Sequence, residues 1–474
     1  MPRPPDAAAL AELRAVVGEA GCLDAPADVA PFVEDFRRLY RGSTPLVLLP
    51  AGVEEVARIL EICDRARIGV VPQGGNTGYC AGATPDRSGT QIVLAMRRMH
   101  RIREVDATDH TMIVEAGCTL AAAQAAARAA DRLFPLSLGS EGTAQIGGNL
   151  STNAGGTAVL RYGMMRDLTL GLEVVLAGGR VLSALKKLRK DNTGYDVKSL
   201  FIGAEGTLGV ITAAALKIYP LPSDPATALV GVASPAAALE LLVRLRGSFG
   251  DEISSFELMP RRAVELTVQH VEGVANPLSE SAPWFVLVEI GANRGAEDAA
   301  TRLAEALAAA GAPGPVASAM LAASIAQAQA IWKLRESVPE AQRRHGASLK
   351  HDLSVPVSVV PRLIELGTAL IERMAPDGET VAYGHVGDGN LHFNVSQRPG
   401  ADRAAFLARR QGLQDALFDL TERLGGSFSA EHGIGRLKVD ELARRADPVE
   451  LAIMRDLKRA LDPHGIMNPG KVLA

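Results

Sequence analysis

Residues 139–156 read GSEGTAQIGGNLSTNAGG, and six of these eighteen residues are glycine. Similar glycine-rich loops are QGGNTG (73–78) and GAEGTLG (203–209). Backbone without Cβ atoms lets N–H groups approach an anion closely, and successive N–H groups form a concave nest for phosphate. Several such loops in one half of the chain predict a long ligand with several contacts, such as a dinucleotide. For any single loop, the alternative is a tight turn of an α/β domain.

Two better-known phosphate-binding patterns are not supported. The spacing of the glycines does not match GxGxxG, so a Rossmann site is not expected. The segment GIMNPGK (465–471) has the spacing of a P-loop, but Val472 stands where Ser or Thr would bind Mg²⁺. Nucleotide hydrolysis is therefore not predicted.

Around these loops the first half alternates between strand and helix patterns. We infer the helices and strands from the spacing of apolar residues, which is helical in some segments and alternating in others. The predicted helices are 7–20, 52–68 and 120–133, and the predicted strands are 44–50, 69–73 and two within 91–117. YPLPSDP (219–225) predicts a domain boundary.

The second half has a different α+β organisation. A hairpin-like segment is expected at 382–396. The predicted strands are 226–233, 284–290 and 348–357, and the predicted helices are 235–246, 296–310, 321–345, 359–374, 402–424 and 447–461.

Composition narrows the class of protein. The chain has 474 residues, 50 basic against 54 acidic, and a net charge of −4. This length predicts two to four domains, and the charge balance excludes a globally basic nucleic-acid binder. Four cysteines without a CxxC pair indicate a reducing compartment, and no apolar run approaches the ~18 residues of a membrane span. We therefore expect a cytoplasmic protein without a transmembrane segment and without nucleic-acid binding.

Histidines and carboxylates form a pattern in the second half, in HVGDGNLHFN (385–394) and AEHGIG (430–435). The GDGN turn allows His385 and His392 to fall on facing strands, and alternation places His392 and Asn394 on one face. With Glu431 they would form an N₂O metal site, while His432 can act as a base. Ligand count does not separate zinc, iron and manganese, and a structural role for each histidine remains the alternative.

Two cations precede this pattern. Arg335 and Lys350 could hold a substrate carboxylate, the arginine through two parallel hydrogen bonds and the lysine as a point charge. The alternative is that both are ordinary solvated side chains.

Taken together, these motifs and NPGK (468–471) resemble the FAD-dependent D-2-hydroxyacid dehydrogenases of the vanillyl-alcohol-oxidase superfamily. The D-2-hydroxyglutarate branch is the most similar, with the D-lactate and glycolate branches close to it. The resemblance implies an α+β fold: a two-subdomain α/β FAD-binding domain of the PCMH type, and an α+β cap domain with an antiparallel sheet. It implies a helical segment at 1–40, the FAD domain at 41–220, the cap at 221–424 and a C-terminal segment at 425–474 that returns to the flavin.

The same resemblance assigns the site residues. His385, His392 and Glu431 match the family's metal ligands, usually zinc. His432 matches its base, and Arg335, Lys350, Asn394 and His432 match its substrate contacts. The residues implied to bind FAD are Pro72, Gly74, Gly75, Asn76, Thr77, Gly78, Gly139, Ser140, Gly142, Gly148, Asn149, Thr152, Asn153, Gly155, Gly156, Glu205, Gly206, Gly209, Val210, Ile211 and Asn468.

Two departures from the family pattern affect these expectations. The hydroxyglutarate enzymes carry a residue with a hydroxyl group four positions after the arginine that binds the substrate carboxylate. In this chain that arginine corresponds to Arg335, and the residue four positions later is Pro339. D-lactate, D-malate and glycolate therefore stay open as substrates beside D-2-hydroxyglutarate. The loop QGGNTG has no histidine for covalent attachment, so we expect non-covalent FAD.

The implied reaction oxidises a D-2-hydroxyacid to the 2-oxoacid, with hydride transfer to flavin N5 and metal assistance. Electrons would then pass to an external acceptor such as electron-transfer flavoprotein or a quinone, because no redox cysteine pair or Fe–S pattern is present. Relatives often form dimers, so a homodimer is expected. Oxidase activity, a metal-dependent hydrolase and a flavin-binding subunit without catalysis are the rival interpretations, and the last two explain fewer of the motifs.

Overall fold

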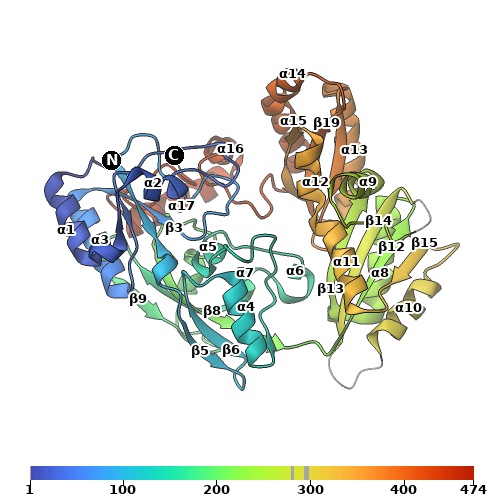
Figure 1. Cartoon of the computed structure of the whole chain (residues 1–474), viewed down its shortest axis with the longest axis horizontal. Coiled ribbons are helices and arrows are strands. Elements are labelled where there is room, and N and C mark those ends of the chain that lie inside the picture. The colour runs from blue at the N-terminus through green and yellow to red at the C-terminus, as the bar shows by residue number, and fades with distance from the viewer. Residues whose placement is uncertain (1, 279–281, 293–297, 474) are drawn as a thin grey trace. The chain divides into compact units, whose positions relative to one another are not determined.

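The computed structural model describes residues 2–278, 282–292 and 298–473, and the chain divides into two compact units. Unit 1 comprises Met1–Gly156, Gly163–Leu221 and Glu431–Ala474, and unit 2 comprises Thr157–Tyr162 and Pro222–Ala430. Residues 157–162, which lie inside the predicted FAD domain, are thus grouped with unit 2. The C-terminal return to unit 1 begins at Glu431. Figure 1 shows this return as red segments, which lie among the blue N-terminal elements.

The first sheet of unit 1 is built around parallel strands. Its order is β1-β2-β4-β3, with β2 and β3 parallel to β4 and β1 antiparallel to β2. Helices α1 and α3 share a buried core with one face, and residues of α2 pack with the other. These elements are β1 (Cys22–Leu23), β2 (Val47–Leu48), β3 (Gly69–Gln73), β4 (Gln91–Ala95), α1 (Ala7–Val17), α2 (Pro26–Val29) and α3 (Val53–Ala66).

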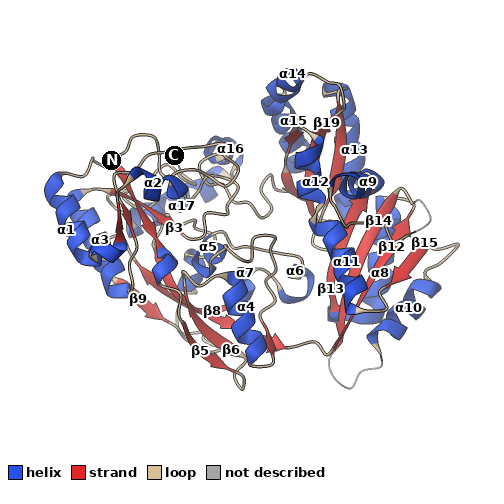
Figure 2. Cartoon of the chain, in the orientation of Figure 1, coloured by secondary structure: helices blue, strands red, loops and turns tan. Residues whose placement is uncertain are grey.

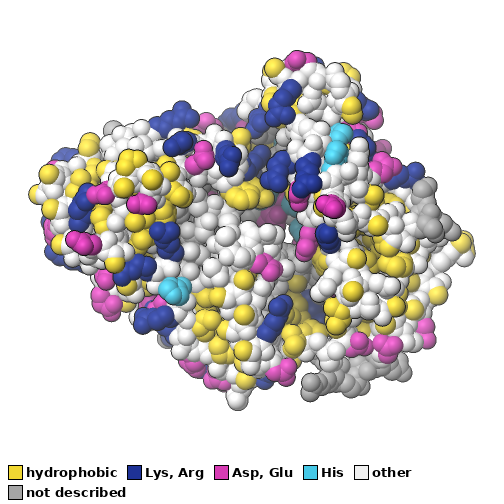
Figure 3. All heavy atoms as spheres, in the orientation of Figure 1, with side chains coloured by type: hydrophobic (Ala, Val, Ile, Leu, Met, Phe, Trp, Pro, Cys, Tyr) yellow, Lys and Arg dark blue, Asp and Glu magenta, His cyan; other side chains and the backbone are white. Residues whose placement is uncertain are grey.

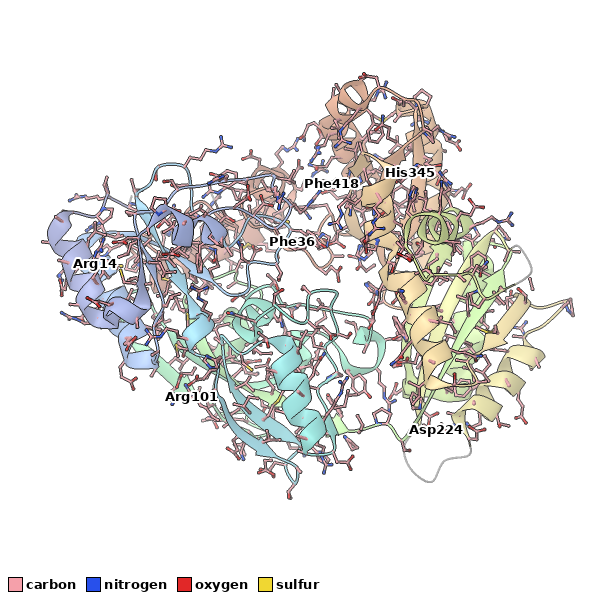
Figure 4. The ribbon with its side chains drawn as sticks, viewed as in Figure 1. Arg14, Phe36, Arg101, Asp224, His345 and Phe418 are labelled. Carbon is pink, nitrogen blue, oxygen red and sulfur yellow. The ribbon has the colours of Figure 1, made fainter. Side chains whose placement is uncertain are left out.

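The second sheet of unit 1 is antiparallel, in the order β5-β6-β10-β8-β9. Arg101 at its edge, labelled in Figure 4, donates from Nη2 to the buried Glu115 at 2.9 Å. The strands are β5 (Ile102–Asp106), β6 (Thr111–Glu115), β8 (Thr169–Val175), β9 (Val181–Ala184) and β10 (Val210–Lys217), with a separate pair β7 (Arg132–Leu133) and β11 (Tyr219–Pro220). The remaining helices of unit 1 are α4 (Leu120–Ala129), α5 (Ile146–Ser151), α7 (Met165–Leu168), α16 (Val439–Arg445) and α17 (Pro448–Leu461).

Unit 2 contains a larger antiparallel arrangement. One sheet has the order β13-β14-β12-β15, and in the other both β18 and the β16/β17 segments pair with β19. An antiparallel bridge between Leu258 and Gly384 joins β13 to the end of β18. The strands are β12 (Asp224–Val232), β13 (Ile253–Pro260), β14 (Trp284–Ala292), β15 (Val316–Leu321), β16 (Ser348–Leu349), β17 (Asp352–Ser354), β18 (Gly378–Tyr383) and β19 (Asn390–Gln397).

Helices cover these strands. Residues of α9, α11 and α12 form a buried core with β12–β14 and β18, and Figure 2 shows helices lying across the strands of this unit. All eight residues of β13 are buried. The helices are α6 (Val159–Tyr162), α8 (Pro235–Phe249), α9 (Arg261–His270), α10 (Ala299–Ala309), α11 (Ile325–Glu336), α12 (Val338–His345), α13 (Val360–Met374), α14 (Arg403–Ala408) and α15 (Arg410–Arg423).

Several predicted elements differ from the observed ones for identifiable reasons. The predicted helix 321–345 is two helices, because a proline ring at Pro339 would clash with the carbonyl four residues earlier, that of Arg335. Arg335 therefore lies in the last turn of α11. The 91–117 region holds β4, β5 and β6 rather than two strands, and β13 and α9 were not predicted. Residues 296 and 297 of one predicted helix lie outside the described residues.

Among the described helices, none combines the length and apolar character needed to cross a bilayer. Acidic and basic side chains both lie on the visible face of each unit, in line with the net charge of −4 (Figure 3).

Candidate active site

Two glycine-rich loops of unit 1 lie against each other. A Cβ added to Gly75 would come within 1.9 Å of the carbonyl oxygen of Thr143, and one added to Gly74 would be 3.4 Å from the nitrogen of Gly148. The loop that follows β3 therefore packs directly on the 139–149 segment. Glycine is required at Gly75 by this close approach of two backbones.

Other glycines of the same loops face empty space. No atom lies within 4 Å of a Cβ built on Gly78, Gly139, Gly142 or Gly148, and none of these residues has a positive φ. Neither packing nor backbone conformation explains glycine at these four positions. Gly78, Gly139 and Gly142 are exposed, so their backbone is accessible to a ligand.

Unpaired polar atoms support this interpretation. Among the described residues, Gln145 Oε1, Asn149 Nδ2 and Asn468 Oδ1 are buried without a hydrogen-bond partner. A buried polar atom without a partner is costly, so a ligand with both donors and acceptors is expected to meet these atoms. The edge of a flavin ring carries both kinds of group. The residues of unit 1 therefore fit FAD.

Several predicted cofactor residues use their side chains within the protein. Asn76 Nδ2 donates to the carbonyl of Glu34 at 2.8 Å, and Asn153 Oδ1 accepts from Arg166 N at 2.9 Å. Thr152 Oγ1 donates to the carbonyl of Gly148 at 3.0 Å. These residues shape the loops, which leaves backbone groups as their available contacts with a ligand.

The remaining predicted cofactor residues are described by their packing. An added Cβ would come within 2.1 Å of the Ser137 carbonyl oxygen at Gly156 and within 2.8 Å of Val174 Cγ1 at Gly209, so packing favours glycine there. Gly206 has a φ of 70°, a conformation that favours glycine. Pro72 lies in β3 beside Gly206, while Val210 and Ile211 begin β10. Thr77, Ser140 and Gly155 lie in the same loops.

The predicted base, His432, belongs to unit 1. Its ring lies against the ring of Tyr79, with centroids 4.6 Å apart, and Tyr79 directly follows the cradle residue Gly78. His432 Nε2 is 3.7 Å from Glu431 Oε1. The histidine is thus placed beside one end of the proposed cofactor cradle.

Glu205 holds the segment that follows His432. Its two carboxylate oxygens accept from Ile434 N at 2.7 Å and Gly435 N at 2.8 Å. Asn468 Nδ2 donates to the Glu205 carbonyl at 2.7 Å. Burial raises the pKa of this carboxyl, against the lowering effect of the two backbone N–H groups. The predicted role of Glu205 as a flavin contact therefore needs its backbone, because its carboxylate binds the protein.

In unit 2, β19 carries His392 and Asn394 two residues apart, as the alternation predicted. The predicted position of His385 on the facing strand is wrong. His385 lies in the connection between β18 and β19, where Gly384 has φ 143° and turns the chain out of the strand. The rings of His385 and His392 are nevertheless close, with centroids 5.5 Å apart.

A buried carboxylate that sequence reasoning missed connects the predicted residues. Glu257 on β13 is 1% exposed, and its Oε1 lies 2.6 Å from His385 Nδ1. Its Oε2 accepts from Arg335 Nε at 2.9 Å and Nη2 at 2.7 Å. Burial acts to raise the pKa of Glu257, but His385 and Arg335 outweigh it and lower that pKa to about 2.

Arg335 is accordingly paired within the protein. It is 6% exposed and its guanidinium lies over the ring of Tyr383, 4.9 Å from the centroid. Because Nε and Nη2 bind Glu257, the Nη1 end is what remains for a substrate carboxylate. Tyr383 also contacts His392, with ring centroids 5.2 Å apart. Arg335, Tyr383, His385 and His392 therefore form one cluster around Glu257.

The other two predicted substrate contacts lie near this cluster in the fold. Asn394 is 2% exposed, and its Nδ2 donates to Gln342 Oε1 of α12 at 2.9 Å. Lys350 is half-buried in the break between β16 and β17, and not on a continuous strand as predicted.

The candidate metal ligands divide between the units. His385 and His392 lie in unit 2, whereas Glu431 is the first residue of the C-terminal part of unit 1. Unit 2 adds Asp352, whose Oδ1 is 3.9 Å from His392 Nδ1 and which had not been predicted as a ligand. Two imidazoles and a carboxylate suit a divalent transition metal.

Known proteins similar to this chain are consistent with the two-unit organisation. The family described as FAD linked oxidases, C-terminal domain, matches residues 221–472, and the FAD binding domain family matches residues 44–184. Among solved structures, p-cresol methylhydroxylase has a TM-score of 0.77 at 17% identity, covering 98% of this chain and 96% of that one. This likeness shows the fold, and it confirms the predicted α+β flavoprotein architecture.

Curated relatives are similar over most of their length. The mitochondrial D-2-hydroxyglutarate dehydrogenase of Bos taurus is 40% identical, over 94% of this chain and 80% of the relative. The Arabidopsis thaliana protein of the same name is 37% identical, over 93% and 77%. The D-2-hydroxyglutarate–pyruvate transhydrogenase of Saccharomyces cerevisiae is 34% identical, over 99% and 95%.

The names of these relatives contradict the predicted cytoplasmic location, because the bovine and Arabidopsis proteins are named as mitochondrial. Few cysteines indicate a reducing environment, but that criterion does not single out the cytosol. The similarity over both units confirms the family inferred from the motifs: the chain belongs to the FAD-linked oxidases, among the FAD-dependent D-2-hydroxyacid dehydrogenases.

Proposed function

We propose that this protein oxidises D-2-hydroxyglutarate to the 2-oxoacid, with FAD held in unit 1 and a divalent metal bound by the histidines of unit 2. The observation that carries the proposal is the joint presence of the open glycine cradle and the Arg335–Glu257–His385 cluster. The relatives named for D-2-hydroxyglutarate, at 34–40% identity, supply the substrate.

FAD would be held by backbone groups around Gly78, Gly139, Gly142 and Gly148, and by the unpaired side-chain atoms of unit 1. Non-covalent binding is proposed because the loop 73–78 has no histidine or cysteine. The nearest cysteine along the chain, Cys80, is buried with its Sγ 3.4 Å from the Gly433 carbonyl.

The metal, proposed to be zinc, would be held by His385, His392 and Glu431. Within unit 2, Ala430 N donates to the carbonyl of Asp352 at 3.4 Å, and Glu431 is the next residue of the chain. Asp352 is the alternative oxygen ligand.

The roles of the chain's own residues follow from their chemistry. When bound, FAD supplies the hydride acceptor and the metal supplies a Lewis acid. His432 removes the proton of the C2 hydroxyl, since a neutral imidazole nitrogen can accept a proton as a general base. Lys350 and the Nη1 end of Arg335 bind carboxylate charge, and Asn394 orients the substrate from β19.

The charge of Arg335 is largely balanced by Glu257, so Lys350 and the metal carry most of the net positive charge for a substrate with two carboxylates. Pro339 lies in the first turn of α12 and cannot donate a hydrogen bond. Because Pro339 lacks a hydrogen-bond donor for a substrate carboxylate, D-malate, D-lactate and glycolate form the second candidate substrate class. Electrons would then pass to an external acceptor, electron-transfer flavoprotein or a quinone, and we propose a homodimer.

An anaerobic substrate panel tests the proposal. Purified protein should be yellow, and D-2-hydroxyglutarate should bleach its flavin absorbance faster than D-malate, D-lactate, glycolate and the L enantiomers. The rate of bleaching in a stopped-flow instrument ranks the substrates. A colourless protein that does not take up FAD, or a flavin that no 2-hydroxyacid reduces, would overturn the proposal. Faster bleaching by D-malate or D-lactate would move the assignment to the second class.

A further inference from the structure

Glu257 contacts two residues with separate proposed tasks, the metal ligand His385 and the carboxylate-binding Arg335. We propose that Glu257 is the positioning residue of the unit 2 site, which presents His385 Nε2 to the metal and holds Arg335 for the substrate. The proposal rests on the proposed metal site and deepens it.

The register of the sheet produces the contact with His385. Leu258 and Gly384 form an antiparallel bridge, with backbone hydrogen bonds of 2.9 and 3.0 Å in the two directions. In antiparallel pairing the residue before Leu258 is opposite the residue after Gly384, so Glu257 is the cross-strand neighbour of His385. Backbone pairing therefore fixes this carboxylate beside this imidazole.

The contact selects one state of the imidazole. An ionised carboxylate only accepts hydrogen bonds, so His385 Nδ1 is the donor across the 2.6 Å contact with Glu257 Oε1. In the neutral ring the lone pair is then on Nε2, and a lone pair is what an imidazole nitrogen needs to bind a metal. Metal-binding histidines commonly donate their second N–H to a carboxylate in this way. The Asp352 carboxylate lies farther from His392, with its Oδ1 3.9 Å from His392 Nδ1.

The other oxygen of Glu257 fixes the arginine. Nε and Nη2 of Arg335 both donate to Oε2, and the Tyr383 ring covers the guanidinium. The flexible arginine side chain is thereby held in one conformation with its Nη1 end remaining. Since one carboxylate orients both groups, metal affinity and substrate affinity should depend on the same residue.

The experiment measures metal affinity in FAD-loaded protein by chelator competition, with metal content from mass spectrometry. Glu257→Gln keeps the shape of the side chain but can present an NH₂ group to His385 Nδ1, which permits the other tautomer. We expect zinc binding to weaken 10- to 100-fold. Arg335→Met, which keeps Glu257, should change metal affinity less than threefold while raising the KM for D-2-hydroxyglutarate at least tenfold.

Two further variants separate the possible outcomes. His385→Ala should abolish high-affinity metal binding; if it does not, the proposed metal site itself is wrong. If His385→Ala loses the metal but Glu257→Gln binds it as the wild type does, the metal site is right and the positioning role of Glu257 is wrong. Glu257→Gln leaves Arg335 buried without its partner, so the double variant Glu257→Gln/Arg335→Met supplies a neutral pair. The double variant should keep its FAD and show the same weakened metal binding, and a return to wild-type affinity would overturn the proposal.

Discussion

Gly75 and Gly148 lie in loops that contact each other, but they are glycines for different reasons. A Cβ added to Gly75 would collide with the Thr143 carbonyl. A Cβ added to Gly148, which lies in the short helix α5, would have no neighbouring atom within 4 Å. Gly75 is therefore needed for the packing of unit 1, whereas Gly148 borders the space proposed for FAD. Substitution of Gly75 should affect folding, and substitution of Gly148 should affect cofactor binding.

A matched pair of alanine variants tests this distinction. Gly148→Ala should leave the free energy of unfolding of the FAD-free protein unchanged or raise it by up to about 1 kcal/mol, because alanine favours helix. The same variant should weaken FAD binding at least tenfold, or about 1.4 kcal/mol. Gly75→Ala should destabilise unit 1 by about 1–3 kcal/mol through overpacking. Urea unfolding and flavin-to-protein absorbance ratios measure both effects, and undiminished FAD binding by Gly148→Ala would show that the open space lies outside the cofactor site.

At the scale of elements, the loop that carries His432 has no helix or strand to hold it. Its conformation depends on Glu205, which binds the N–H groups of Ile434 and Gly435, and on Gly435, where a Cβ would come within 2.1 Å of the Cys80 carbonyl. Because this loop lies outside helices and strands and its N–H groups bind the Glu205 carboxylate, the position of His432 should be sensitive to substitution of Glu205.

Glu205→Ala should lower the free energy of unfolding by about 1–3 kcal/mol for each N–H group left unpaired. It should also slow flavin reduction by D-2-hydroxyglutarate, because His432 is no longer held. Glu205→Gln is the control, since it keeps one acceptor. Burial raises the pKa of Glu205 in the wild type. The free energy of unfolding of the wild type should therefore exceed that of Glu205→Gln most strongly in acid. This difference should shrink as the pH rises above the ordinary pKa range of a carboxyl. An advantage that grows from pH 5 to pH 8 in urea unfolding would contradict this account.

At the scale of the whole molecule, the FAD cradle and the metal-binding histidines belong to different units. Loading of the two groups should therefore be separable, even though the proposed reaction needs both.

Removal of the metal tests this separation. Treatment with a chelator should abolish bleaching of the flavin by D-2-hydroxyglutarate, while the flavin-to-protein ratio stays within about 10% of its starting value. Dithionite should still reduce the flavin, and added Zn²⁺ should restore the reaction with substrate. Release of FAD by the chelator would show that the two sites depend on each other.

The sequence predicted those parts of the fold and site that depend on local pattern. Alternation placed His392 and Asn394 on one face of β19. The glycine pattern predicted the loops that are proposed to hold FAD, and that role stays a prediction. The local sequence pattern could not reveal the role of Glu257. Its contacts arise from a backbone bridge between Leu258 and Gly384, which are 126 positions apart in the chain. The one available signal was a single carboxylate within the otherwise uncharged strand ISSFELMP (253–260). The division of 321–345 into two helices follows from Pro339, because proline breaks or kinks the interior of a helix.

The bridge between Val70 and Met467 adds the segment 466–468 to the edge of the first sheet, beside β3. Val70 N donates to the Ile466 carbonyl, and Asn468 N donates to the Val70 carbonyl, both at 2.8 Å. During synthesis β3 leaves the ribosome long before this partner, and residues 222–430 of unit 2 are made in between. Contacts between such distant segments form late in folding. Unit 1 can therefore complete this sheet edge, and bring Asn468 to its place beside β3, only after the C-terminal segment has been made.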